Sequence, residues 1–408
     1  MSETALRCSI CRVKYEGKGN RYVCPQCGGS IEPEIVLRGR ESSLIAILKN
    51  GSSPSEGIWG YRSFFPGFEE IEPVTMGEGN TPFQKAESLG DLYGISGLYL
   101  KNETVNPSAS YKDRFASLAI SLYRRDKVKA VAIGSAGNAG SSVAAYCAKA
   151  GIPCNVILPD TGLMARAMQV RAYGARFLKV DGEVSDCIEL VEQGTDLHGW
   201  RNGCTTMLHN PLPSEGYKSI VYEMYRQMPE TFPDVIICPV GGGILLSKIY
   251  KACKELKELG LIFEIPRIVG VQAEGCAPFV KAFTEGKTAT AAWENAKTIA
   301  SSINDPVTFE GKTALFSARM SRGTAVAVTD EEIRSAMREI ARREAIIAEP
   351  SSAATVAAAG KLRAEGWIRE GETVACILTG SGLRDLPYFT EEGNEQKIRK
   401  GHPEDIRL

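Results

Sequence analysis

Short apolar runs alternate with amphipathic segments along the chain from Lys129 to Ile347. Runs such as 155–158 and 235–238 have the length and the β-branched residues of buried strands, whereas 245–256 repeats apolar residues at helical spacing. Strands that alternate with helices in this way are typical of parallel βαβ units. The sequence therefore predicts an α/β fold built on parallel sheets.

The same criteria place further elements, and the glycine-rich stretches each follow an expected strand. No fixed repeat and no low-complexity tract interrupts the pattern. The expected strands are 98–101, 130–133, 155–158, 176–180, 235–238, 268–271 and 373–378, and the expected helices are 43–49, 115–123, 140–150, 164–173, 245–256, 330–343 and 352–365.

Composition narrows the possible functions. The chain has 408 residues, which is enough for two or three domains. Its net charge is -1 and it has no basic block that would favour binding to nucleic acid or to an acidic membrane. No apolar run approaches the length of a membrane span, and the first residues lack the features of a signal peptide, so we expect a cytoplasmic protein without a membrane partner. The chain has only three histidines, so its composition does not favour a mechanism based on a histidine triad.

Four of the twelve cysteines form two Cys-x-x-Cys pairs, Cys8/Cys11 and Cys24/Cys27. Four thiolates in this spacing can bind zinc tetrahedrally, and a segment of about forty residues has little core of its own. We predict a structural zinc ribbon; a ribbon that folds against the main body without metal is the alternative. The other eight are expected to be core residues or free thiols: Cys147, Cys154, Cys187, Cys204, Cys238, Cys253, Cys276 and Cys376.

Candidate chemistry begins at Lys112, where an Asn-Pro turn and a Ser-Ala-Ser run give way to an apolar helix. A lone lysine there is usually a solvated surface residue. Three glycine-rich loops downstream favour a functional interpretation: 134–140, 241–243 and 380–382. The loop 241–243 lies between an apolar strand and a helix, where backbone N–H groups and the helix dipole can bind a phosphate.

These motifs resemble the threonine synthase family of fold-type II pyridoxal-phosphate enzymes. The resemblance rests on Ser110-Tyr111-Lys112-Asp113-Arg114, on the loop at Asn138, on 349–354 and on 378–385, and it extends over nearly the whole chain. It implies that Lys112 forms the Schiff base with pyridoxal phosphate. The cofactor's phosphate would be held by Gly241, Gly242, Gly243, Ile244 and Leu245.

The resemblance also assigns the ring and substrate contacts. Asn138 would contact the 3-hydroxyl of the ring and Thr379 its nitrogen, although local turn capping is the alternative for each. Because Thr379 is neutral, the ring nitrogen is expected to stay less fully protonated. The substrate carboxylate would bind at Ser135, Ala136 and Gly137.

The expected reaction is the conversion of O-phosphohomoserine and water to threonine and phosphate. Candidate anchors for the substrate phosphate are Arg166, Lys218 and Arg114. Pro213 stands where the family often has an arginine, which leaves open a β-replacement enzyme such as cysteate synthase, using O-phosphoserine with sulfite or another nucleophile. A non-catalytic zinc-ribbon scaffold is the alternative from another class.

The resemblance further implies the domain organisation of the tryptophan synthase β-like fold. The ribbon would cover residues 1–40, a large cofactor-binding domain 41–117 and 228–408, and a smaller mobile domain 118–227. The cofactor would lie between the two α/β domains, and the protein would be a homodimer that closes on its small phospho-amino-acid substrate.

Overall fold

The structure, a computed structural model, describes residues 5–16, 21–50, 54–135, 137–159, 164–181 and 184–389. Within these ranges, no helix has both the length and the apolar character needed to cross a membrane. The α-helices are α1 Glu41–Asn50, α2 Glu87–Tyr93, α3 Asp113–Arg125, α4 Asn138–Ala150, α5 Met164–Ala172, α6 Val184–His198, α7 Ser219–Gln227, α8 Ile244–Glu258, α9 Pro278–Thr284, α10 Gly311–Met320, α11 Asp330–Glu344 and α12 Pro350–Ala364. Short 3₁₀ helices occupy Pro54–Phe64, Glu103–Val105, Pro213–Lys218, Ser301–Ile303 and Leu386–Tyr388.

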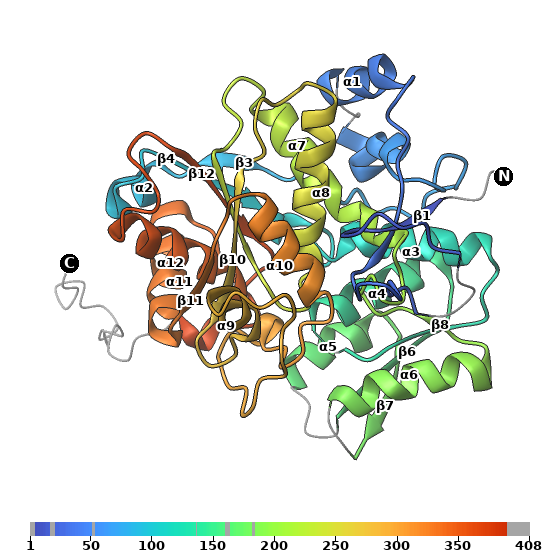
Figure 1. The fold of residues 1–408 in the computed structure, drawn as a ribbon. Coiled ribbons are helices and arrows are strands. Elements are labelled where there is room, and N and C mark those ends of the chain that lie inside the picture. Colours follow the sequence, from blue (N-terminus) through green and yellow to red (C-terminus); the bar gives the residue numbers. More distant parts are fainter. Residues whose placement is uncertain are drawn as a thin grey trace, which may run out of the picture.

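Two separate sheets organise the chain (Figure 1). The larger sheet is parallel except for its last strand, β3, and the smaller one is parallel throughout. The larger has the order β11 (Ala325–Val328), β10 (Arg267–Ala273), β9 (Val235–Pro239), β12 (Thr373–Leu378), β4 (Gly97–Asn102), β3 (Phe83–Lys85), and the smaller has the order β7 (Arg176–Val180), β6 (Cys154–Pro159), β5 (Val131–Ile133), β8 (Arg201–Asn202). This arrangement agrees with the predicted α/β fold. The domain boundaries and the mobility of a smaller domain stay predictions.

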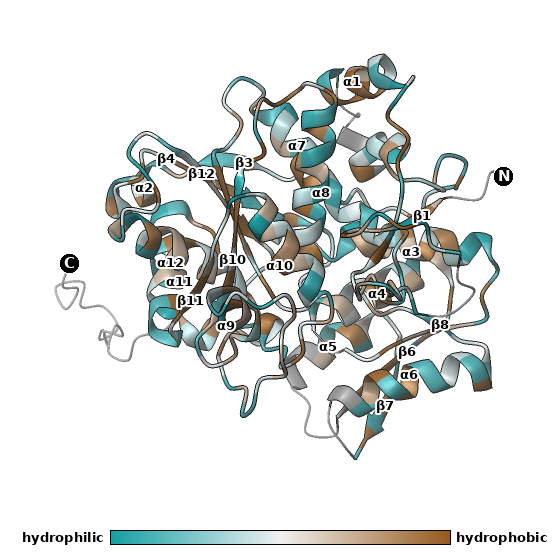
Figure 2. Ribbon diagram, viewed as in Figure 1, coloured by the Kyte–Doolittle hydropathy of each residue, from teal (hydrophilic) through white to brown (hydrophobic). Residues whose placement is uncertain are grey.

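Helices cover both faces of the larger sheet, so its strands are apolar on both sides. In β9, Ile237 belongs to the apolar cluster that includes α11 and α12, whereas its neighbour Ile236 belongs to the cluster that includes α8 and α10. Strands buried on two faces read as continuous apolar runs, which is why they could be recognised in the sequence. Figure 2 shows β10 and β12 in brown, with teal positions along the surrounding helices.

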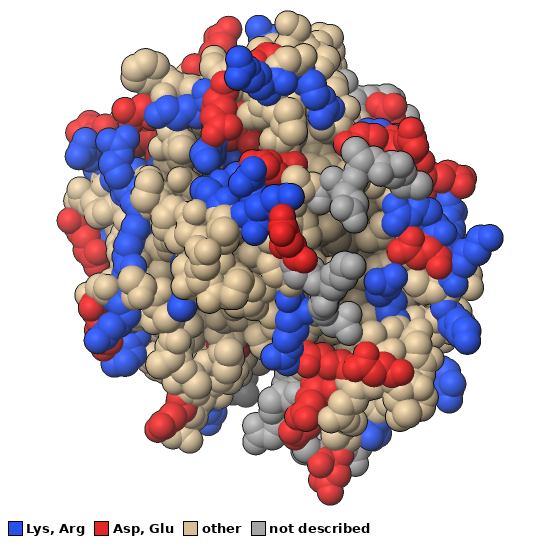
Figure 3. Space-filling model, turned by 45° about the vertical axis from the view of Figure 1, so that its right-hand side comes forward, with Lys and Arg blue, Asp and Glu red and all other residues tan. Residues whose placement is uncertain are grey.

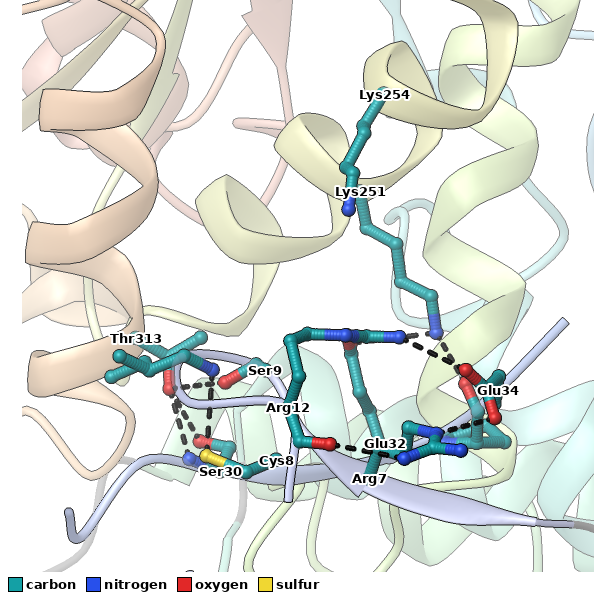
Figure 4. Close-up of polar contacts among 12 residues, drawn as sticks. Arg7, Cys8, Ser9, Arg12, Ser30, Glu32, Glu34, Lys251, Lys254 and Thr313 are labelled. Carbon is teal, nitrogen blue, oxygen red and sulfur yellow. Dashed lines mark hydrogen bonds and ion pairs between the residues drawn. The ribbon is translucent and has the colours of Figure 1, made fainter. Parts of the chain in front are cut away.

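The N-terminal segment folds into a small unit around a two-stranded antiparallel sheet, β1 (Leu6–Cys8) and β2 (Ile31–Pro33). It packs against α10, where the Thr313 hydroxyl lies 3.1 Å from Ser9 Oγ and accepts a hydrogen bond of 3.0 Å from the Ser30 N–H (Figure 4). On the face drawn in Figure 3, basic and acidic side chains are interspersed.

The expected strands and helices are all present, with boundaries shifted by a few residues. The pattern missed several elements, among them α6, α7, α9 and α10. The eight cysteines outside the ribbon are buried and unpaired, as predicted.

Candidate active site

The candidate site lies where the strand order of the larger sheet reverses. β9 and β12 are parallel neighbours although they are far apart in the sequence, so the loops that follow them leave the same edge of the sheet. Such switch points are where open α/β sheets bind ligands. The loop after β9 contains Gly241–Gly243 and the loop after β12 contains Thr379. The segment before Lys112 contacts the second of these loops, because the Tyr111 N–H donates to the Thr379 carbonyl oxygen at 2.9 Å.

Lys112 directly precedes α3, as the sequence predicted. Its Nζ donates to Thr205 Oγ1 at 3.1 Å and lies 4.7 Å and 5.5 Å from the ring centroids of Tyr111 and Tyr217. Burial alone would lower the pKa of Lys112, but the oxygens of the two tyrosines favour the charged ammonium, so the pKa is raised overall. The amine is therefore held in one place and carries a proton. Thr205 and Tyr217 were not found from the sequence, since no local pattern marks them.

Asn138 and Thr379 share one buried carboxylate. Asn138 is the first residue of α4, and its Nδ2 lies 2.8 Å from Glu349 Oε2. The hydroxyl of Thr379 lies 3.5 Å from Glu349 Oε1 and 3.2 Å from Ser352 Oγ. The sequence indicated both residues as contacts of the cofactor ring, and these two roles stay predictions. It noted Glu349 only as part of a family motif, and the contact with Asn138 spans 211 positions, so no local signal could have found it.

The triple glycine forms the entrance to α8. Gly243 has a φ of 94°, which favours glycine, and a Cβ atom on Gly241 would lie 2.5 Å from Asp305 Oδ2. Helix entrances of this form bind phosphate through free backbone N–H groups. Two carboxyl groups lie beside the loop, and burial raises the pKa of Asp305 to about 6 and that of Glu310 to about 7. Glu310 is therefore partly protonated near neutral pH, which lessens its repulsion of a phosphate, whereas Asp305 is mostly ionised there.

These features fit pyridoxal phosphate. An amine, a glycine-rich helix entrance and two polar side chains lie around one edge of the sheet. Among the expected carboxylate-binding residues, Ser135 and Gly137 lie just before α4, where the Gly137 N–H donates to Ser135 Oγ at 3.3 Å. Ala136 lies outside the described residues, and so does the side chain of Arg166, whose backbone belongs to α5.

The structure corrects the expectation for the other two phosphate anchors. Arg114 is fully buried between Glu103 and Glu223, with contacts of 2.7 Å and 2.6 Å. Lys218 is also fully buried, and its Nζ lies 2.8 Å from Glu215 Oε2 and 2.9 Å from Glu255 Oε1. Both cations already neutralise buried carboxylates, so neither is available to a substrate phosphate. The sequence shows that a residue is charged but not where its side chain points. The prediction that Arg114 and Lys218 bind the substrate phosphate was wrong for this reason.

The two Cys-x-x-Cys pairs come together in the ribbon. All four sulfur atoms of Cys8, Cys11, Cys24 and Cys27 lie within 4.8 Å of one another. The sulfur atoms of Cys8 and Cys27 are 3.4 Å apart, and those of Cys11 and Cys24 are 3.6 Å apart. Four thiolates around one zinc at about 2.3 Å would be roughly 3.8 Å apart. The ribbon therefore has the donor set and the spacing that tetrahedral zinc requires.

Comparison with known proteins agrees with this geometry. Residues 74–380 match the family of pyridoxal-phosphate dependent enzymes, so the chain is an enzyme of that class. It is 36% identical to a threonine synthase of Methanosarcina acetivorans, over 98% of this chain and 97% of the relative. It is 34% identical to a threonine synthase of Methanocaldococcus jannaschii, over 96% of both chains. The chain therefore belongs to the threonine synthase family.

Solved structures show the same fold. A threonine deaminase of Solanum lycopersicum superimposes with a TM-score of 0.65 at 22% identity, covering 76% of this chain and 86% of the other. Maize serine racemase gives a TM-score of 0.63 at 24% identity, covering 74% of this chain and 89% of the other. At these identities the comparison concerns the fold alone. Membership in an enzyme family nevertheless argues against the non-catalytic scaffold.

Proposed function

We propose that this protein is a threonine synthase that converts O-phosphohomoserine and water to threonine and phosphate. The observation that carries the proposal is Lys112, which is fixed at the N-terminus of α3 and joined through Tyr111 to the turn that bears Thr379. The full-length similarity to two threonine synthases supports the choice of reaction.

The chain's own residues would divide the work as follows. Bound pyridoxal phosphate supplies an electron sink for the bonds around the amino-bearing carbon of the substrate. Lys112 supplies the amine that holds the cofactor and later accepts and returns protons. Gly241–Leu245 would bind the cofactor phosphate, and Asn138 and Thr379 would orient the ring. Ser135 and Gly137, with Ala136 between them, would bind the substrate carboxylate, and Arg166 remains the candidate for the substrate phosphate.

The cofactor assignment is tested by reconstitution with pyridoxal phosphate. Wild type should develop a visible absorbance band, and Lys112→Ala should not. Lys254→Ala is a control, because this lysine lies half-exposed on α8 and pairs only with Glu258 at 3.5 Å among the contacts described. Equal spectra for wild type and Lys112→Ala would refute the assignment.

The reaction is tested by phosphate release. O-phosphohomoserine alone should yield threonine and phosphate in equal amounts. Release from O-phosphoserine with sulfite, and none from O-phosphohomoserine, would instead identify a cysteate synthase-like enzyme, which the proline at position 213 keeps in consideration.

We further propose that Cys8, Cys11, Cys24 and Cys27 bind one structural zinc. The sulfur positions support this proposal. Metal analysis of the purified protein should find about one zinc per chain in wild type. The variant Cys8→Ser should lose the metal, whereas Cys187→Ser, which changes a buried cysteine elsewhere, should keep it. Zinc-free wild type would favour the ribbon that folds without metal. The homodimer stays a prediction of the family resemblance, and the cytoplasmic location stays a prediction of the sequence.

A further inference from the structure

The amine of Lys112 lies among two aromatic rings and a hydroxyl group. Its Nζ is 4.7 Å from the ring centroid of Tyr111 and 5.5 Å from that of Tyr217, within the range in which an aromatic face attracts a cation. The same Nζ donates to Thr205 Oγ1 at 3.1 Å. We call Tyr111, Thr205 and Tyr217 the amine site. They come from the turn before α3, the loop after β8 and the 3₁₀ helix Pro213–Lys218, so three segments converge on one nitrogen atom.

Tyr217 is held in place by its neighbours in the chain. A Cβ atom on Gly216 would lie 2.1 Å from the Arg114 carbonyl oxygen, so the 3₁₀ helix packs directly against the first turn of α3. On the other side of the tyrosine, Nζ of Lys218 donates to the Phe64 carbonyl oxygen at 2.8 Å in the core. Tyr217 itself is fully buried. The ring of Tyr217 therefore has a fixed position relative to the helix that follows Lys112.

The hydroxyl of Tyr217 is buried and makes no hydrogen bond with any residue that the structure describes. Burial raises the pKa of Tyr217, although the charge of Lys112 opposes the change, so the phenol stays neutral. An ammonium group has three N–H donors, and Thr205 accepts from one of them. The amine site thus contains two further donors on Lys112 and one buried acceptor on Tyr217.

The proposed reaction releases the amine of Lys112. When the amino group of the substrate takes its place on the cofactor, Lys112 has to accept and return protons as a free side chain. A charged amine in a partly buried site is costly unless its charge is compensated. Two carboxyl groups also face this charge: burial raises the pKa of Asp305 and Glu310, and the charge of Lys112 opposes the change. Asp305, mostly ionised near neutral pH, compensates part of the charge, and the contacts of the amine site add to it.

We propose that Tyr111, Thr205 and Tyr217 are positioning residues that receive the released amine of Lys112 and keep it as an ammonium while the substrate occupies the cofactor. The aromatic faces attract its charge without taking its proton, and Thr205 fixes its direction. Lys112 can then act as an acid before it returns to the cofactor. This inference rests on the proposed function, and it adds the groups that control the proton of Lys112.

The position of the released amine is tested by crystallography of the loaded enzyme. The phosphonate analogue of O-phosphohomoserine has a carbon–phosphorus bond that cannot be eliminated, so it should hold the enzyme with Lys112 released. In that crystal structure, Nζ should lie within about 6 Å of both ring centroids and within hydrogen-bond distance of Thr205 Oγ1. A released amine that lies outside the amine site would overturn the inference.

The control of the proton is tested by the pH profile of kcat. Loss of the Lys112 proton should produce the basic limb. Tyr217→Leu should move that limb down by about 0.7 pH unit, a change of about fivefold in proton concentration, with KM and the acidic limb unchanged. Tyr217→Phe keeps the ring, so its basic limb should stay closer to that of wild type. A wild-type basic limb in Tyr217→Leu, or an equal displacement in both variants, would contradict the role of the ring.

Tyr225→Leu is the matched control, since it also removes a buried tyrosine. This residue belongs to α7, and its ring centroid lies 6.3 Å from that of Phe232. Its pH profile should equal that of wild type. If Tyr217→Leu does not fold, Thr205→Val gives the same test, because it removes the acceptor of the Lys112 amine and keeps the shape of the side chain. An unchanged basic limb in Thr205→Val would then overturn the inference.

The outcomes separate the two proposals. Wild type that binds the cofactor through Lys112 and releases phosphate, but holds the released amine elsewhere, would overturn the amine site alone. Failure of wild type to form the visible absorbance band would overturn the proposed function as well.

Discussion

At the residue scale, Glu310 shows how burial changes a carboxyl group. It is the last residue before α10, and Oε1 accepts from the Met207 N–H at 2.8 Å, while its backbone N–H donates to the Gly242 carbonyl oxygen at 2.8 Å. Burial raises the pKa of Glu310 from 4.5 to about 7, although the Met207 N–H opposes the change. The folded protein therefore binds this proton more tightly than the unfolded chain does.

A raised pKa in the folded state stabilises the protein at low pH, and that stabilisation is lost as the pH rises from about 4.5 to about 7. In protein without added pyridoxal phosphate, Glu310→Gln should remove about 3 kcal/mol of this pH dependence, at 1.36 kcal/mol per pKa unit. Urea unfolding at pH 5 and pH 8 measures it. Glu264→Gln, at an exposed position, controls for the lost charge. Parallel pH profiles for wild type and Glu310→Gln would contradict the assignment.

At the scale of elements, a buried ionic network joins α3 and α7 to the larger sheet. Arg114 of α3 contacts Glu223 of α7, which also accepts from Lys101 of β4 at 2.8 Å. Glu103, the other partner of Arg114, directly follows β4. All four side chains are fully buried, so each charge depends on the others for compensation.

Arg114→Met should lower the free energy of unfolding by about 3–5 kcal/mol, because it leaves buried carboxylates uncompensated. Arg124→Met, on the same helix, is the matched control. Arg124 is partly exposed and pairs with the exposed Glu72, so a change below about 1 kcal/mol is expected. Denaturant unfolding followed by circular dichroism measures both. Equal effects of the two substitutions would show that the network contributes no more than a surface pair.

At the scale of the whole molecule, the ribbon contacts the helices of both sheets. Its Glu32 lies 3.2 Å from Lys248 and 3.4 Å from Lys251 on α8. On the other side, the Tyr22 N–H donates to the Leu208 carbonyl oxygen at 2.8 Å, and Arg21 pairs with Glu192 of α6 at 2.6 Å. The ribbon thus bridges the two halves that surround the candidate site.

Glu32→Gln should destabilise the protein by about 1–3 kcal/mol, because it removes a partner from the buried Lys248 and from the partly buried Lys251. Burial alone would raise the pKa of Glu32, but Lys251 and Lys248 lower it, so its contribution is present above about pH 4.5 and is lost as the pH falls. Glu34→Gln is the matched control, since Glu34 pairs with the partly exposed Arg7 (Figure 4). This pair should contribute less than about 1 kcal/mol to the free energy of unfolding. Thermal unfolding at pH 7 and pH 4 measures the difference. An effect of Glu32→Gln that is equal at both pH values would contradict the ionic bridge.

The sequence by itself determined seven of the strands and seven of the helices, the cysteine pairs of the ribbon and the place of Lys112 at the start of α3. These features depend on residues close together in the chain, through apolar periodicity, turn residues and short motifs. Glycine loops could be placed after strands for the same reason.

Only the tertiary structure decided which charged side chains face the site. Arg114 and Lys218 looked like phosphate anchors, but carboxylates from other elements bind both of them in the core. Glu349 contacts Asn138, which is 211 positions away in the sequence, because the N-termini of α12 and α4 lie next to each other. The direction and the partners of a charged side chain depend on such distant contacts, and no local pattern contains them.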